Sequence, residues 1–296
     1  MFISGYFIAA LIHALGLSLL HRVHFQPASQ RLLIIHLAWT ELCTSLSQAL
    51  VYTFLVNGRC DPYSTCSFID KFNYRLFGGT SKLIMIYLIC DRAFDIYFHL
   101  RYPLYFTQQT IKKMLMTLWV VGVTFALISV LMGKFRIGGE MIQENWRQYE
   151  GIFITVFFLG TDSLIVITAV ITYMYLYLKV RKILANSHGN AQQDNTRTPQ
   201  SSKFLLPCLI IATYLIFNLT GTVLHFYSRF VLREASLTKS VLSEIAHMFM
   251  VLGWASDGVL YIFLQKSVRE KLLSMFRKSV LPISSTRSAR NAESTL

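Results

Sequence analysis

Long apolar stretches alternate along the chain with shorter polar segments. A transmembrane helix needs about 20 mostly apolar residues to cross a hydrocarbon core of about 30 Å, and seven stretches meet this length. They lie at about 2–20, 32–56, 67–92, 111–132, 151–178, 204–227 and 243–264. The pattern predicts an all-α integral membrane protein, in which residues 1–265 form a bundle of seven transmembrane helices.

The third stretch is the least apolar, because Arg75 and Lys82 lie inside it. Its second half is strongly apolar, and no proline interrupts residues 64–102. We therefore expect a central helix that its neighbours shield from lipid. The first stretch begins at Phe2 without the basic start and cleavage site of a signal peptide, which indicates a span that is retained.

A short amphipathic helix is expected at residues 266–278, directly after the last apolar stretch. The apolar positions that recur there at helical spacing are Val268, Leu272, Met275 and Phe276. Such a helix lies on the anionic inner surface of a membrane; the alternative is a frayed end of the last span. Residues 279–296 are expected to be a disordered cytoplasmic tail, whose end resembles a ligand of PDZ-domain proteins.

The composition adds a strong charge asymmetry to this picture. Only 15% of the residues are charged and 54% are hydrophobic, whereas soluble domains carry about 25% charged residues, so a soluble enzyme is not expected. The net charge is +13. One side of the predicted bundle holds 18 Lys and Arg against 5 acidic residues. This side consists of the loops at about 21–31, 93–110 and 179–203, the tail after residue 264 and the flanking residues. Since basic residues concentrate on the cytoplasmic side, the C-terminus is placed in the cytoplasm and Met1 outside, and no nucleic-acid partner is expected.

Three short motifs fall in order within these stretches. The second stretch contains His36-Leu37-Ala38-Trp39-Thr40-Glu41. The third ends with Cys90-Asp91-Arg92-Ala93, which is followed by Arg101-Tyr102-Pro103-Leu104-Tyr105. The seventh contains Asp257-Gly258-Val259-Leu260-Tyr261. Trp119 lies in the fourth stretch. Together these motifs resemble those of the rhodopsin-like (class A) G-protein-coupled receptors, and the resemblance covers nearly the whole chain.

The resemblance implies an orphan receptor of the plasma membrane, which binds an unidentified extracellular ligand within the bundle and activates a heterotrimeric G protein. The residues that it assigns to coupling are Asp91, Arg92, Asp257 and Tyr261. No acidic residue flanks positions 201–203, which leaves Asp91 to neutralise Arg92. The alternative for Arg92 is a basic side chain that reaches the membrane surface from a helix end. Arrestin and membrane lipids are further partners that the family implies.

The chain departs from the family pattern at several positions. Ala93 stands in place of the motif tyrosine, Gly258 in place of the proline and Glu41 in place of the aspartate. The fifth stretch has no proline, and the sixth lacks the Cys-Trp-x-Pro motif. Helix kinks in this chain therefore have to come from glycine or from local 3₁₀ or π geometry.

The cysteines give another departure. The family usually joins the top of the third span to the second extracellular loop. Cys66 lies close to the first of these positions, but residues 133–150 contain no cysteine. Cys60 and Cys66 both face the oxidising side and are candidates for a small local disulfide; two free thiols are the alternative.

Several residues of the third stretch are candidates for a ligand pocket. Tyr74, Gly78 and Ser81 share one helical face, because steps of three and four residues return to the same side. Arg75 lies beside them and would either receive an anionic group or belong to an internal ion pair. His247 is a further pocket candidate, with aromatic packing as the alternative. The last stretch has no lysine, so retinal bound there as a Schiff base is excluded.

Charged residues inside a membrane need partners. Asp162 in the fifth stretch is the candidate partner of Lys82, and the two would form a buried ion pair. A transporter or channel and an intramembrane metal-dependent hydrolase are alternative functions. The chain shows neither a repeated half nor three convergent zinc ligands, so the receptor is preferred and no enzymatic activity is expected.

A polar cluster is expected in the middle of the bundle. By resemblance, Glu41, Ser81 and Asp257 take positions that surround a sodium ion in the family, and His13 takes the place of an asparagine. Two carboxylates in one dry cluster disfavour each other's ionisation. Either a sodium ion lies between them, or one carboxyl holds a proton, or His13 takes a proton and pairs with Glu41. A structural hydrogen-bond network is the alternative to all three.

Overall fold

The structure is a computed structural model, and nearly all the residues that it describes are helical. The described residues are 2–22, 28–57, 65–98, 102–134, 140–187, 209, 211–228, 237–263, 268–270 and 272–274. No strand occurs among these residues, which agrees with the predicted all-α class.

Most of the helices are long. They are α1 (Phe2–Arg22), α2 (Ala28–Val56), α3 (Thr65–Asn73), η1 (Tyr74–Gly78), α4 (Gly79–Tyr97), α5 (Tyr102–Tyr105), α6 (Gln108–Lys134), α7 (Glu140–Ser187), η2 (Tyr214–Leu219), α9 (Thr220–Phe226) and α10 (Leu237–Phe263). The segments α3, η1 and α4 follow one another without a break, as do η2 and α9. Each of the seven predicted stretches therefore overlaps one helical segment of the structure.

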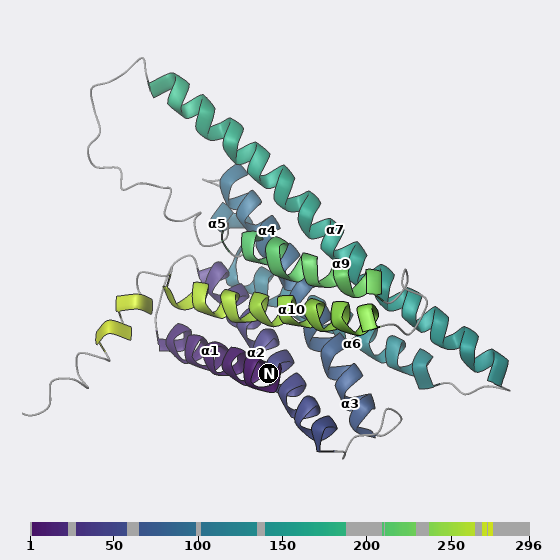
Figure 1. Cartoon of the computed structure of the whole chain (residues 1–296). Coiled ribbons are helices and arrows are strands. Elements are labelled where there is room, and N and C mark those ends of the chain that lie inside the picture. The colour runs from purple at the N-terminus through teal and green to yellow at the C-terminus, as the bar shows by residue number, and fades with distance from the viewer. Residues whose placement is uncertain are drawn as a thin grey trace, which may run out of the picture.

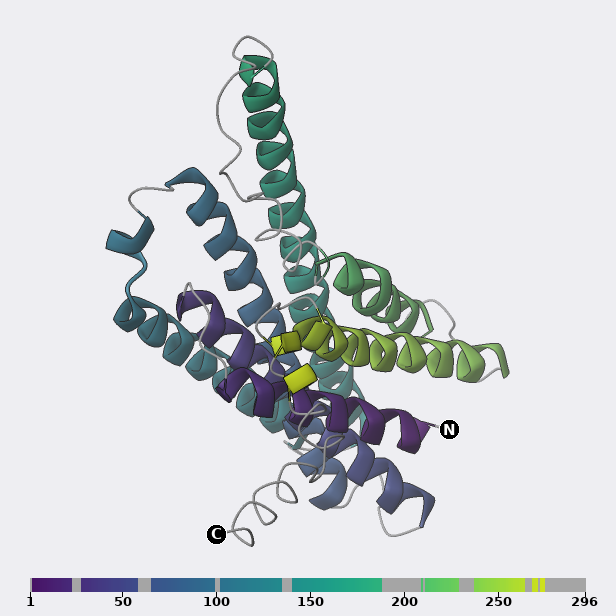
Figure 2. The same ribbon diagram turned by 90° about the vertical axis from the view of Figure 1, so that its left-hand side faces the viewer.

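The helices pack side by side in a closed ring, in which successive long helices run in alternating directions (Figures 1 and 2). Helix α1 contacts α2 and α10, α10 contacts η2 and α9, and α9 contacts α7. Helix α7 contacts α4, which closes the ring by contacting α2. Since α4 also contacts α6, it lies at the centre of the packing, as expected for the least apolar stretch.

Helix α7 is much longer than predicted. The expected span covers 151–178, but the helix begins at Glu140 and ends at Ser187, so the predicted loops at 133–150 and 179–203 are partly helical. Hydropathy detects only the apolar part of a helix, whereas Glu, Gln, Arg and Lys at its two ends are good helix formers. The pictures show the C-terminal end of α7 extending past the neighbouring helices (Figures 1 and 2).

The outer surface of the bundle is apolar. In the described part of the chain, three helical segments are long and apolar enough to cross a membrane, namely Ile3–Arg22, Gln108–Met132 and Gly151–Tyr175, and a shorter apolar segment is Ile211–Phe226. Large apolar side chains on them are exposed, with 69% of Leu11, 69% of Met116 and 65% of Val156 accessible. So many exposed apolar side chains indicate a surface that faces lipid, and the protein is a membrane protein.

Helix α2 directs its polar residues inward. The buried polar side chains on this helix are Thr40, Glu41, Thr44, Ser45 and Gln48. The hydroxyl groups of Thr40 and Thr44 donate to backbone carbonyl oxygens of the preceding turn, at 2.7 and 2.8 Å. These residues lower the mean hydropathy of α2 without meeting lipid, because they line the interior of the bundle.

Glycine allows several helices to approach closely. A Cβ atom at Gly258 of α10 would lie 2.7 Å from Ile12 Cγ2 and 3.2 Å from His13 Nδ1 of α1. A Cβ atom at Gly253 would lie 2.8 Å from the side-chain nitrogen of Asn218 in η2. Small residues at helix contacts are typical of membrane bundles. Gly258, which stands where the family has proline, therefore permits close contact between α10 and α1.

Three places among the described residues have π-helical geometry, namely η1 at Tyr74–Gly78, η2 at Tyr214–Leu219 and residues 227–228 directly after α9. The first lies in the third predicted stretch, and the other two lie in the sixth or at its end. A π segment widens one turn of a helix by an extra residue and occurs often at functional sites. The sixth stretch lacks the family's proline motif, and π geometry, one of the alternatives expected there, is present.

Short helical pieces follow the last long helix. Residues 268–270 and 272–274 are helical, within the range predicted for the amphipathic helix. Val268 is fully buried in the core that α1, α2 and α4 share, and Leu272 packs against this core, while Arg269 and Glu270 are exposed. The apolar positions 268 and 272 therefore face the bundle, and the charged positions 269 and 270 face away from it. The predicted tail at 279–296 lies outside the described residues.

Candidate functional site

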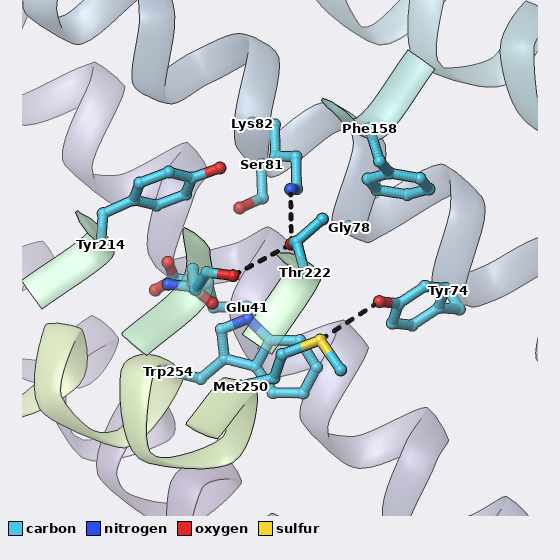
Figure 3. Close-up of a pocket in the computed structure, with 11 residues that line it drawn as sticks. Glu41, Tyr74, Gly78, Ser81, Lys82, Phe158, Tyr214, Thr222, Met250 and Trp254 are labelled. Carbon is cyan, nitrogen blue, oxygen red and sulfur yellow. Dashed lines mark hydrogen bonds between the residues drawn. The ribbon is translucent and has the colours of Figure 1, made fainter. Parts of the chain in front are cut away.

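A small cavity lies between α2, η1, α4, α7, η2, α9 and α10 (Figure 3). The residues that line it are Glu41, Tyr74, Gly78, Ser81, Lys82, Phe158, Tyr214, Asn218, Thr222, Met250 and Trp254. Its volume is about 30 Å³, and a water molecule needs roughly 10–15 Å³ measured in this way. Pockets for drug-sized ligands have about 300–1,000 Å³. In this conformation the cavity therefore has room for about two waters or a small ion.

Lys82 and Asp162, which the sequence pairs, form an ion pair on the wall of this cavity. The Tyr214 hydroxyl donates a hydrogen bond to the same carboxylate oxygen, Asp162 Oδ1. Lys82 Nζ also donates to Thr222 Oγ1 at 3.5 Å. The ammonium group lies between the rings of Phe158 and Tyr214, 5.0 and 5.8 Å from their centroids, as Figure 3 shows. We call Lys82, Asp162 and Tyr214 the charged triad.

The charged triad joins three helical segments at one point. Lys82 comes from α4, Asp162 from α7 and Tyr214 from the first position of η2. The Asp162 side chain is almost completely buried, so its charge depends on these two donors. Removing one partner of a buried ion pair costs about 3–5 kcal/mol. The triad therefore holds the π-helical segment η2 against α4 and α7.

The predicted polar cluster is formed by His13, Glu41 and Asp257, which are all buried. His13 Nδ1 lies 3.6 Å from Glu41 Oε2, and the Glu41 and Asp257 carboxyl groups are within hydrogen-bonding reach of each other. Thr213 Oγ1 donates to Asp257 Oδ1 at 2.7 Å. Two carboxyl groups in contact require a shared proton or a nearby cation. Ser81 shares the cavity wall with Glu41, so the cluster adjoins the cavity.

The described part of the chain contains no group of three His, Cys, Asp or Glu residues arranged to hold a metal ion. Cys43 and Cys90 are free thiols. The disulfide predicted between Cys60 and Cys66 involves one residue and one side chain outside the described part of the chain.

In the C-terminal half of α4, Asp91 is fully buried and accepts a hydrogen bond from the Tyr102 hydroxyl of α5. The Tyr102 ring stacks on Phe106 with centroids 4.9 Å apart. Arg92 follows Asp91 in α4, and its side chain lies outside the described part, as does that of Tyr261. Sequence reasoning missed Tyr102 as a partner of Asp91, although both belong to quoted motifs.

Two further motif residues meet between α2 and α6. The Trp119 indole nitrogen lies 3.4 Å from His36 Nδ1 and is the donor. The Trp119 ring also packs edge-on against Phe77 of η1, with centroids 6.1 Å apart. These contacts connect the fourth predicted stretch with the second and the third.

The structure separates the ligand-pocket candidates. Tyr74 and Gly78 line the cavity, and the Tyr74 hydroxyl donates to the Met250 sulfur at 3.6 Å (Figure 3). Arg75 is buried in η1, but it does not line this cavity. His247 packs against Tyr52, with ring centroids 6.4 Å apart, and it does not line this cavity.

Comparison of the chain with models of known protein families and with curated proteins finds no match. A functional assignment therefore depends on the geometry of the bundle and its polar groups. These groups lie close together inside the bundle, because Lys82 of the charged triad and Glu41 of the His13–Glu41–Asp257 cluster line the same cavity. Such a set can hold water, share a proton and change its connections when the helices move.

Proposed function

We propose that this chain is a seven-transmembrane receptor of the rhodopsin-like class, which activates a heterotrimeric G protein at the plasma membrane when an extracellular ligand binds. The N-terminus is outside and the C-terminus is in the cytoplasm. One observation supports the proposal most: family-like residues from different predicted stretches meet in space. Glu41 contacts Asp257, and His36 contacts Trp119. Within the motif region at the end of the third stretch, Asp91 accepts a hydrogen bond from Tyr102.

Signal transfer in this proposal runs through the interior of the bundle. A ligand that reaches the cavity from outside displaces Tyr74 from Met250, because a thioether is a weak hydrogen-bond acceptor. The displacement of Tyr74 is passed on to Tyr214. When the Tyr214 hydroxyl leaves Asp162, η2 is free to move relative to α4 and α7. The helix that begins with η2 then moves at its inner end, and Arg92 becomes available to the G protein. The basic cytoplasmic loops favour the acidic surfaces of a partner and of the inner leaflet.

The test compares basal nucleotide exchange by purified G proteins of the main classes in membranes that contain wild type or Arg92→Ala. Coupling above that of empty membranes is expected for wild type with at least one class, and Arg92→Ala is expected to lose it at an unchanged surface level. Arg22→Ala is the matched control, because Arg22 is an exposed arginine at the inner end of α1. Undiminished exchange with Arg92→Ala would remove this residue from the coupling role.

The second candidate is a transporter, since ionisable groups within a membrane also mark ion pathways. Lys82, Asp162, Glu41 and Asp257 are such groups. The purified protein in proteoliposomes separates the two functions: a transporter dissipates a proton or sodium gradient, whereas a receptor leaves the gradient intact and promotes nucleotide exchange.

A further inference from the structure

Two histidines face each other away from the cavity and the polar cluster. His225 lies in the last turn of α9, and His247 lies in α10. Their ring centroids are 5.8 Å apart, with an angle of 67° between the planes. Both side chains are half-buried. The proposed receptor function uses neither residue.

A series of aromatic rings holds His247 in place. Its ring meets Tyr52 of α2 edge-on at 6.4 Å, and Tyr52 stacks on Tyr6 of α1 at 5.5 Å. Tyr6 in turn packs against Trp254, at 6.0 Å, and Trp254 lies about two helical turns after His247 in α10. These contacts hold the His247 ring in its position on α10.

The spacing of the two rings suits a shared metal ion. Imidazole nitrogens bind zinc at about 2.0–2.1 Å, which puts a ring centroid about 3.2 Å from the metal. Two imidazoles on one tetrahedral ion then have centroids about 5.2 Å apart, and about 6.4 Å apart if the arrangement is linear. The observed 5.8 Å lies between these limits. Rotation about the Cβ–Cγ bond, which is a broad torsion in histidine, turns a nitrogen toward the ion and leaves the centroid almost in place.

We propose that His225 and His247 form a binding site for a divalent transition-metal ion, for which zinc is the natural probe. Imidazole suits zinc, copper and nickel, and water completes the coordination of zinc. The ion joins α9 to α10 and stabilises the packing of these two helices. The site goes beyond the proposed receptor function and does not depend on it.

The test uses the purified full-length chain in detergent and measures thermal unfolding during a titration with zinc chloride. Wild type is expected to show a saturable rise of the unfolding temperature that EDTA reverses, since an ion that binds the folded state stabilises it by mass action. His225→Phe and His247→Phe keep an aromatic ring but lose the ligands, and each is expected to weaken zinc binding about tenfold or more. His21→Ala, which removes an exposed histidine at the inner end of α1, is expected to bind zinc as wild type does.

A change of ligand type makes the test specific. His247→Cys is expected to restore binding and to shift the preference toward cadmium, because thiolate is a softer ligand than imidazole. A merely structural histidine would show no such rescue. Zinc binding that is equal in wild type and both phenylalanine variants, or absent from wild type, would overturn the proposal. Neither result depends on G-protein coupling, so the two proposals fail separately.

Discussion

Replacing Lys82 by methionine removes the ammonium group that contacts Asp162 and keeps a flexible apolar side chain of similar length. The carboxylate then lies buried with the Tyr214 hydroxyl as its remaining donor from the charged triad. Breaking a buried pair in this way costs about 3–5 kcal/mol in soluble proteins. At about 2–4 °C for each kcal/mol in a chain of 150–250 residues, we expect the unfolding temperature to fall by roughly 6–20 °C.

The assay follows thermal unfolding of the purified chain in detergent, with the monomer fraction as a second measure of folding. Asp162→Asn is measured beside Lys82→Met, and the double variant completes a double-mutant cycle. Contacting residues show interaction energies of about 0.5–3 kcal/mol in such cycles. The double variant is therefore expected to lose less stability than the two single variants together, because removing both charges leaves no unpaired charge behind. Additive losses would refute the pairing.

Tyr87→Phe is the matched control for the third member of the triad. The Tyr87 hydroxyl is buried in α4 and has no hydrogen-bond partner in the described part of the chain. Its removal is expected to leave the free energy of unfolding within about 0.5 kcal/mol of wild type, as most substitutions away from specific interactions do. Tyr214→Phe removes a hydrogen bond to a charged group and is expected to cost about 1.5–3 kcal/mol. Equal effects of the two substitutions would contradict the role of Tyr214.

Three further outcomes are expected. Glu41→Gln or Asp257→Asn is expected to change basal nucleotide exchange and to flatten its response to sodium and pH, because one carboxyl no longer shares a proton or a cation. An unchanged response would mean that the cluster is only structural. Gly258→Ala inserts a Cβ into the contact with α1 and is expected to lower the free energy of unfolding by about 1–3 kcal/mol. The Cβ of Gly160→Ala meets open space, so this variant is expected to raise it by up to about 1 kcal/mol. Thermal unfolding of both variants measures the difference. Tyr102→Phe removes the hydrogen bond to the buried Asp91 of α4 and is expected to alter basal nucleotide exchange at equal surface expression. The exchange assay described for Arg92 measures this change.

The positions of the helices could be predicted from the sequence because hydropathy and helix length are local properties. The pairing of Lys82 with Asp162 could also be predicted, since few charges lie inside the spans and each needs a partner. Tyr214 and Tyr102 could not be predicted as hydrogen-bond donors. The chain has 15 tyrosines, and a phenol fits an apolar or a polar environment equally well, so the pattern does not distinguish those that donate to a carboxylate.

The face of the third stretch that meets the cavity could be predicted from helical spacing. Steps of three and four residues place Tyr74, Gly78 and Ser81 on one side, and all three line the cavity. Arg75 is buried beside this face and does not line the cavity. The π geometry of residues 74–78 could not be predicted, because helical spacing assumes a regular α-helix.

The length of α7 gives the molecule a mechanical property. Its 48 residues extend about 72 Å at 1.5 Å per residue, more than twice the roughly 30 Å of the hydrocarbon core. The end of this helix lies about 36 Å from the middle of its apolar segment, so a tilt of about 5° displaces it by about 3 Å. Asp162 lies near the middle of that segment, close to the pivot of such a lever. A change in the charged triad that tilted α7 by this small angle would therefore move the far end of the helix by about 3 Å.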